Sequence, residues 1–111
     1  MKTGIELIAA ERARQVEKEG WTAEHDDQHD NADLALAACY YALPAPLEID
    51  YGRGGYVIEP DDLFPCEWAE VWMKRSGDTI RNLVKAGALI AAEIDRLQRR
   101  AVADDESEVG E

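Results

Sequence analysis

The sequence of 111 residues has few cysteines, no long apolar run and little positive charge, and each absence excludes a class of protein. Its two cysteines, Cys39 and Cys66, have no C-x-x-C spacing, so we expect free thiols rather than a disulfide or half of a zinc site. No segment approaches the ~18 apolar residues of a membrane span, and the charged N-terminal segment lacks the apolar core of a signal peptide. These absences predict a cytoplasmic protein.

Acidic residues outnumber basic residues over the whole chain. Twelve lysines and arginines face 24 acidic residues, so the net charge is -12. Proteins bind duplex nucleic acid with clustered Lys and Arg, which release counterions from the phosphates, and we see no such cluster along the chain. We therefore expect neither duplex nucleic acid nor a membrane among its partners. Much of the acidic excess follows residue 101, which predicts a disordered acidic tail over residues 101–111.

The patterns that are present predict one mainly α domain over residues 1–100, with three principal helices and a small β-hairpin insertion. Thr3 and Glu6 have the spacing of a capping box and Gly20 supplies a stop, so the first helix covers residues 4–19. We expect its core-facing side to carry Ile5, Ile8, Ala9, Arg12 and Val16.

The second helix, over residues 32–41, is apolar nearly all round. Asp30 or Asn31 can cap its N-terminus, and we expect this helix to be the central buried element. Alternating apolar and polar residues then predict a β-hairpin at about residues 47–59, with Gly52-Arg53-Gly54 as its turn.

The third principal helix begins at Ser76 and runs to about Arg100. Its apolar residues recur at 3–4 spacing, in Ile80, Leu83, Val84, Gly87, Ile90, Ala91, Ile94 and Leu97. Such a stripe permits a dimer and serves an intramolecular core equally well. Before this helix, residues 66–72 can form a short helix with two aromatic side chains, Trp68 and Trp72.

The densest group of polar side chains lies between the first two helices, in Gly20-Trp21-Thr22-Ala23-Glu24-His25-Asp26-Asp27-Gln28-His29. Segments held by rigid helices often carry binding sites. The polar side chains of this segment could bind a divalent metal, or they could form a polar pocket against Trp21. The structural alternative is a solvated helix cap with Trp21 in the core. We expect ligand contacts from Trp21, Asp26, Asp27 and His29, and a phosphate contact from Arg53.

The same segment contains an E-x-x-D, Glu24 to Asp27, and in this it resembles one half of the motif of MazG-type nucleotide pyrophosphohydrolases. In all-helical enzymes of that kind, acids from several helices hold Mg²⁺, which bridges the phosphates. The resemblance implies an alternative in which Glu24, Asp27, Glu93 and Asp95 bind Mg or Mn for nucleoside triphosphate hydrolysis.

Together with two other segments, the Trp21 to His29 segment resembles a family of small uncharacterised phage and prophage proteins. The other two segments are Glu11-Arg12-x-Arg14-Gln15 and residues 83–94. Gly20-Trp21-Thr22, Asp26-Asp27 and His29, with Tyr40 or Tyr41 in the next helix, are also similar to the ryanodine-receptor repeat domain. That second resemblance implies a noncatalytic module for nucleotide-like ligands, with Trp21, Asp26 and Asp27 as the positions carried over.

The sequence thus predicts a phage-type accessory protein, rather than an enzyme, that binds a small nucleotide-derived molecule without a cofactor. Such binding would let it sequester an immune or metabolic nucleotide signal in the host cytosol. Two alternatives stay open. One is the hydrolase with Mg or Mn, and the other is a protein-interaction module in which the Trp68 and Trp72 segment docks on a host protein or on another copy of the chain.

Overall fold

The computed structural model describes residues 1–29, 32–44, 46–50, 52–65 and 75–109, with side chains in the last range up to residue 105. It confirms a mainly α fold with a small antiparallel hairpin. The elements are α1 (Gly4–Lys18), α2 (Ala23–Asp27), α3 (Asp33–Ala42), β1 (Leu47–Asp50), β2 (Gly55–Ile58), the 3-10 turn η1 (Pro60–Leu63) and α4 (Thr79–Val109).

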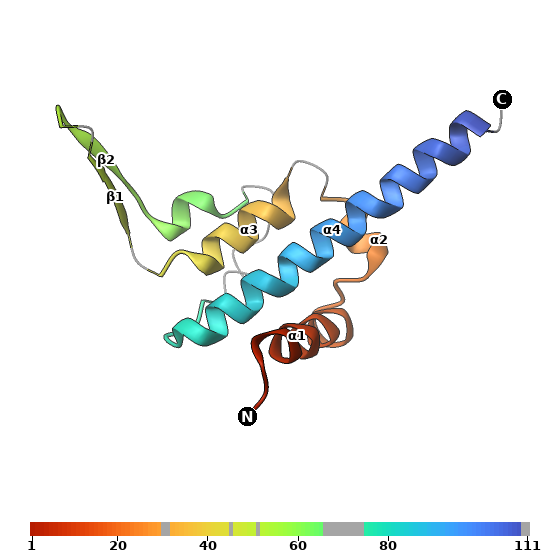
Figure 1. Cartoon of the computed structure of the whole chain (residues 1–111), viewed down its shortest axis with the longest axis horizontal. Helices are drawn as coiled ribbons and strands as arrows, with labels where there is room; N and C mark the ends of the chain where they lie inside the picture. The colour runs from red at the N-terminus through yellow and green to blue at the C-terminus, as the bar shows by residue number, and fades with distance from the viewer. Residues whose placement is uncertain (30–31, 45, 51, 66–74, 110–111) are drawn as a thin grey trace.

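The long helix α4 runs diagonally across the molecule, and the other helices pack around it (Figure 1). α3 lies along one side of α4, whereas α1 lies on another side and is seen nearly end-on. α2 sits beside the C-terminal half of α4, and the hairpin projects from the opposite end of the molecule. Within the described residues, no helix is both long enough and apolar enough to cross a lipid bilayer.

α3 is the central buried element, as predicted. Six of its ten residues are buried, and Leu34 and Ala37 are fully inaccessible. They pack with Leu89 and Ala92 of α4, where the small alanine side chains let the two helices approach closely. The residue at the N-cap position is Ala32, in a left-handed conformation with φ of 63°, and the expected caps Asp30 and Asn31 lie outside the described residues.

The predicted core-facing side of α1 is wrong for Ile5, Ala9 and Val16, whereas Ile8 packs on Gly87 of α4 and Arg12 contacts α2. Ile5 is 82% exposed and Val16 is also exposed, whereas the two buried residues of α1 are Glu11 and Gln15. The carboxylate of Glu11 accepts hydrogen bonds from Arg14 and, at 2.6 Å, from Arg81 of α4. A charged pair supplied by a helix 70 residues away thus replaces the apolar contact that the periodicity of α1 indicated.

The segment from Trp21 to His29, for which the sequence predicts no helix, contains the short helix α2. Thr22 begins it, because the Thr22 hydroxyl accepts a hydrogen bond from the backbone N–H of His25. Gly20, with φ of +73°, supplies the left-handed turn that ends α1 and allows the chain to start a new helix within three residues.

The prediction of a disordered tail after residue 101 is also wrong for residues 101–109, because α4 continues to Val109. This stretch has neither glycine nor proline and is rich in alanine and glutamate, so nothing in it ends a helix that is already formed. The acidic residues here therefore extend α4 away from the rest of the chain (Figure 1).

The predicted hairpin is confirmed. β1 pairs with β2 from Leu47 opposite Ile58 to Asp50 opposite Gly55. Gly52 and Gly54 have φ of +81° and +131°, which a residue with a side chain rarely adopts. The expected short helix at 66–72, with Trp68 and Trp72, lies outside the described residues.

Candidate functional site

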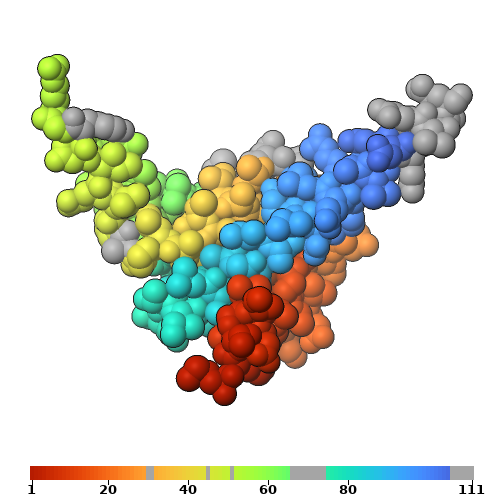
Figure 2. All heavy atoms as spheres, viewed as in Figure 1, coloured from red at the N-terminus to blue at the C-terminus, as the bar shows by residue number. Residues whose placement is uncertain are grey.

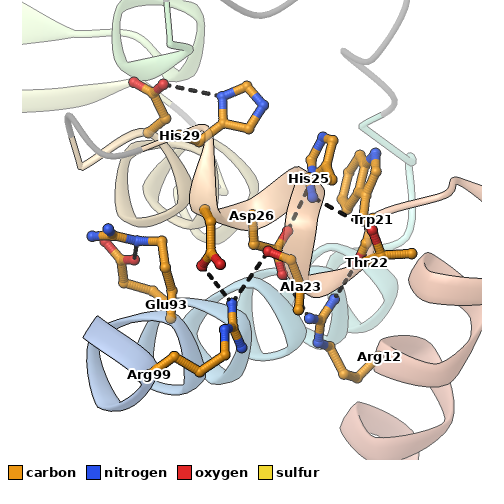
Figure 3. Close-up of polar contacts among 12 residues, drawn as sticks. Arg12, Trp21, Thr22, Ala23, His25, Asp26, His29, Glu93 and Arg99 are labelled. Carbon is orange, nitrogen blue, oxygen red and sulfur yellow. Dashed lines mark hydrogen bonds and ion pairs between the residues drawn. The ribbon is translucent and has the colours of Figure 1, made fainter. Parts of the chain in front are cut away.

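The segment from Trp21 to His29 is built around the carboxylate of Asp26, which is fully buried. Asp26 lies on α2 and faces α1, where its Oδ2 atom is 2.7 Å from Nη2 of Arg12 (Figure 3). Its other oxygen, Oδ1, lies 3.0 Å from Nδ1 of His25. Arg12 also donates a hydrogen bond to the carbonyl oxygen of Trp21. One guanidinium thus joins α1 to both Trp21 and Asp26. The buried contacts of Asp26 with Arg12 and His25 therefore fix the position of the segment.

The aromatic side chains of the segment stack on one another. The rings of Trp21 and His25 are nearly parallel, with an interplanar angle of 6° and centroids 5.8 Å apart. The ring of His29 follows at 4.7 Å from that of His25, and its Nδ1 lies 3.2 Å from a carboxylate oxygen of Asp33. Trp21 is only 5% exposed and belongs to the hydrophobic core. Trp21, from which a ligand contact was expected, therefore faces the interior of the protein, as in the structural alternative.

Asp27, unlike Asp26, points to the surface. Its Oδ1 atom accepts a hydrogen bond of 2.8 Å from Arg99 of α4, and the same guanidinium reaches the carbonyl oxygen of Ala23. The hydrogen bond and charge of Asp27 raise the pKa of Arg99 above its ordinary value. Two contacts from one guanidinium to α2 fix its position against the C-terminal half of α4 (Figure 3).

A surface hollow of about 390 Å³ lies at this junction, lined by Asp27, Arg96, Arg99, Arg100 and Ala103. A second hollow shares Arg99 and Ala103 with it. Arg96 is buried and its Nε lies 2.5 Å from a carboxylate oxygen of Glu93. Arg100 is exposed, and no ion pair joins it to another residue in the part of the chain that the structure describes. Three guanidiniums thus line the first hollow, two of them already paired with a carboxylate, Arg96 with Glu93 and Arg99 with Asp27.

The sequence did not point to these arginines, because their place at the end of a helix suits the helix dipole and needs no other reason. Their i, i+3, i+4 spacing, however, places Arg96, Arg99 and Arg100 on one side of α4. The sequence does not show that Asp27, which is distant from these arginines along the chain, lies against the same side of α4.

The predicted site residues are only partly brought together. Asp26, Asp27 and His29 share the α2 region, but Arg53 lies in the turn of the hairpin, at the other end of the molecule from α2 (Figure 1). A single pocket lined by Arg53 and the Trp21 to His29 segment is therefore not formed. Cys39, expected to be a free thiol, is free and exposed.

Two of the four acids of the hydrolase alternative are paired with arginines. Asp27 pairs with Arg99 and Glu93 pairs with Arg96, while Glu24 and Asp95 are exposed. Among the residues that the structure describes, no three His, Cys, Asp or Glu side chains are arranged so that they could hold a metal ion.

Comparisons of the chain with protein-family models, with curated proteins and with solved structures find no match. Function is therefore argued from the geometry of the chain itself.

Proposed function

We propose that this protein binds a small phosphate-bearing molecule, of the nucleotide-derived class, in the hollow between α2 and α4. The observation that carries the proposal is the meeting of Arg96, Arg99 and Arg100 around about 390 Å³ of open space on a chain whose net charge is -12. A local positive charge against an acidic surface draws an anion to one place.

The chemistry of the lining groups suits a phosphate. A guanidinium offers a planar fork of N–H donors that matches two phosphate oxygens at once. Arg99 is already held by Asp27 and by the carbonyl oxygen of Ala23, so little side-chain entropy is lost when it receives a ligand. Arg100 is exposed and lines the same hollow, so its guanidinium can reach a bound anion.

The size of the hollow supports a small ligand rather than a polymer. Pockets for small molecules occupy roughly 300–1,000 Å³, and the hollow falls within that range. The Trp21 to His29 segment has an indirect part in this proposal, because its buried network sets the position of α2 and thereby of Asp27. A binder of this kind would act as an accessory protein that sequesters a nucleotide signal.

A thermal-shift screen tests the proposal. Full-length protein is heated with mono-, di- and cyclic nucleotides and with inorganic phosphate, each at millimolar concentration. A ligand at 100 times its dissociation constant stabilises by ~2.7 kcal/mol, which raises Tm by on the order of 10 °C in a domain of this size.

Two variants locate the ligand. Arg100→Ala removes an exposed guanidinium at the hollow and is expected to abolish the rise in Tm, whereas Arg53→Ala removes one from the hairpin turn and is expected to leave it intact. If no phosphate-bearing compound raises Tm, or if the two variants behave in the same way, the proposal is wrong.

A further inference from the structure

α4 carries a row of large apolar side chains that the rest of the described chain does not cover. The row, which we call the α4 stripe, has exposed fractions between 47% and 65% and comprises Ile80, Leu83, Ile90, Ile94 and Leu97. The buried residues of α4 that face α3, such as Leu89 and Ala92, lie on a different side of the helix. The stripe is thus not part of the intramolecular core.

The spacing of the stripe is that of a coiled-coil seam. With Gly87 included, the residues follow one another at steps of 3, 4, 3, 4 and 3. Apolar residues that alternate at these steps stay on one face of a helix and pack into the side chains of a facing helix. The repeat is therefore suited to pairing with another helix on either side of Gly87, where Ile8 of α1 already lies.

α1 enlarges this apolar face at Gly87. A Cβ atom on Gly87 would lie 2.5 Å from Cδ1 of Ile8, so the side chain of Ile8 rests directly on the backbone of α4. Ile5, one turn earlier on α1, is 82% exposed. Figure 2 shows α1 and α4 next to each other on one open face of the molecule. Ile5, which was expected to face the core, is thus in position to face a partner.

We infer that this face binds a second copy of the same chain, with the α4 stripe packed against its counterpart. Charge favours this occupant. Of the positions that flank the seam, Val84 and Ala86 are buried within the chain, and the others, Ala91, Glu93, Gln98 and Arg100, carry one acid and one base, although the whole chain has a net charge of -12. Two copies therefore meet along a neutral strip. A strongly basic or acidic partner would find no opposite charge along the strip to recognise.

The size of the face fits a weak, specific dimer. The α4 stripe extends ~26 Å at 1.5 Å per residue, the exposed side of α1 adds ~17 Å, and a helix is ~10 Å wide. Each copy then contributes on the order of 400–500 Å². The dimer therefore buries roughly 800–1,000 Å² in total, at the lower limit of ~1,000 Å² for a specific interface. A dissociation constant on the order of micromolar is expected for such an area.

Sedimentation velocity of the full chain tests this inference, from roughly 0.1 µM to roughly 1 mM, a range that brackets a micromolar dissociation constant. The 12.4 kDa chain is expected to reach twice that mass as the concentration rises. Ile94→Glu places a charge in the middle of the seam and is expected to raise the dissociation constant by ~100-fold or more, because two buried charges face each other in the dimer.

Val102→Glu is the matched control, since Val102 is 57% exposed on the same helix but lies off the seam. It is expected to leave the dissociation constant unchanged within about twofold. Leu83→Ser is a milder second variant, and circular dichroism checks that each variant is folded. A wild-type chain that stays monomeric at the highest concentration overturns the inference. So does an equal effect of Ile94→Glu and Val102→Glu. None of these readouts depends on a ligand in the arginine hollow.

Discussion

The Nη2 atom of Arg12 lies 2.7 Å from the Oδ2 atom of Asp26, and this ion pair joins α1 to α2 through a carboxylate that is fully buried. Arg12 is partly exposed, so the pair is reachable by water from one side only. A charge buried in this way is stable only while its partner is present. The pair therefore orders the segment that leads to the arginine hollow.

Removal of the buried carboxylate is expected to be costly. Asp26→Ala leaves the guanidinium of Arg12 and the ring of His25 without their shared acceptor, and the free energy of unfolding should fall by about 3–5 kcal/mol. Urea unfolding followed by circular dichroism measures this change. Asp27→Ala is the control, because Asp27 is half-exposed and its pair with Arg99 should contribute about 0–1 kcal/mol. Equal losses of unfolding free energy in the two variants would show that the buried carboxylate of Asp26 stabilises the fold no more than the exposed carboxylate of Asp27 does.

Stability is expected to decrease in acid through Glu11. Burial raises the pKa of the Glu11 carboxyl, but the hydrogen bonds and charges of Arg14 and Arg81 together outweigh burial and lower the pKa below its ordinary value of 4.5. A carboxyl with a lowered pKa stabilises the fold above its unfolded pKa, and this contribution is lost as the pH falls through the folded pKa.

Glu11→Gln isolates that contribution. At about pH 7 the variant should be less stable than the wild type by about 1–3 kcal/mol, because a charged hydrogen-bond acceptor is lost. The difference should begin to shrink as the pH falls below the ordinary glutamate pKa, and it should approach zero only below the lowered pKa of the folded state, where the wild-type carboxyl is protonated as well. Urea titrations of both proteins across this pH range measure it, and a difference that is independent of pH would contradict the assignment.

Gly87 and Ile8 are expected to be energetically coupled. Alanine normally stabilises a helix by about 1 kcal/mol relative to glycine, but at position 87 its Cβ would overlap the side chain of Ile8. In an Ile8→Ala background this overlap is absent, so Gly87→Ala should be more favourable there by about 0.5–3 kcal/mol. A double-mutant cycle by urea unfolding measures the coupling. Additive effects of the two substitutions would show that α1 does not rest on Gly87.

Local signals in the sequence were sufficient for several elements. The capping box of Thr3 and Glu6 marked the start of α1, and the two turn glycines located the hairpin. The continuous apolar character of residues 32–41 correctly indicated a buried central helix. Each of these features depends on residues that are close together in the sequence.

Other features depend on contacts between residues that are far apart in the sequence, and these features were not predicted. Glu11 is buried because Arg81 meets it from α4, and no pattern within α1 indicates that contact. The helix α2 was missed because five residues are too short to show a period, although Thr22 is a good N-cap. The arginine hollow forms only because Asp27 and Arg99, 72 residues apart, meet in space.

The most direct test of the proposed binding follows amide and arginine Nε–H resonances of ¹⁵N-labelled protein during titration with inorganic phosphate and with nucleotides. Binding at the arginine hollow predicts saturable shifts concentrated in residues 23–29 and 96–103, including the Nε–H of Arg99, with residues 47–58 unchanged. Shifts that concentrate in the hairpin around Arg53, or no shift at millimolar ligand, would contradict the account.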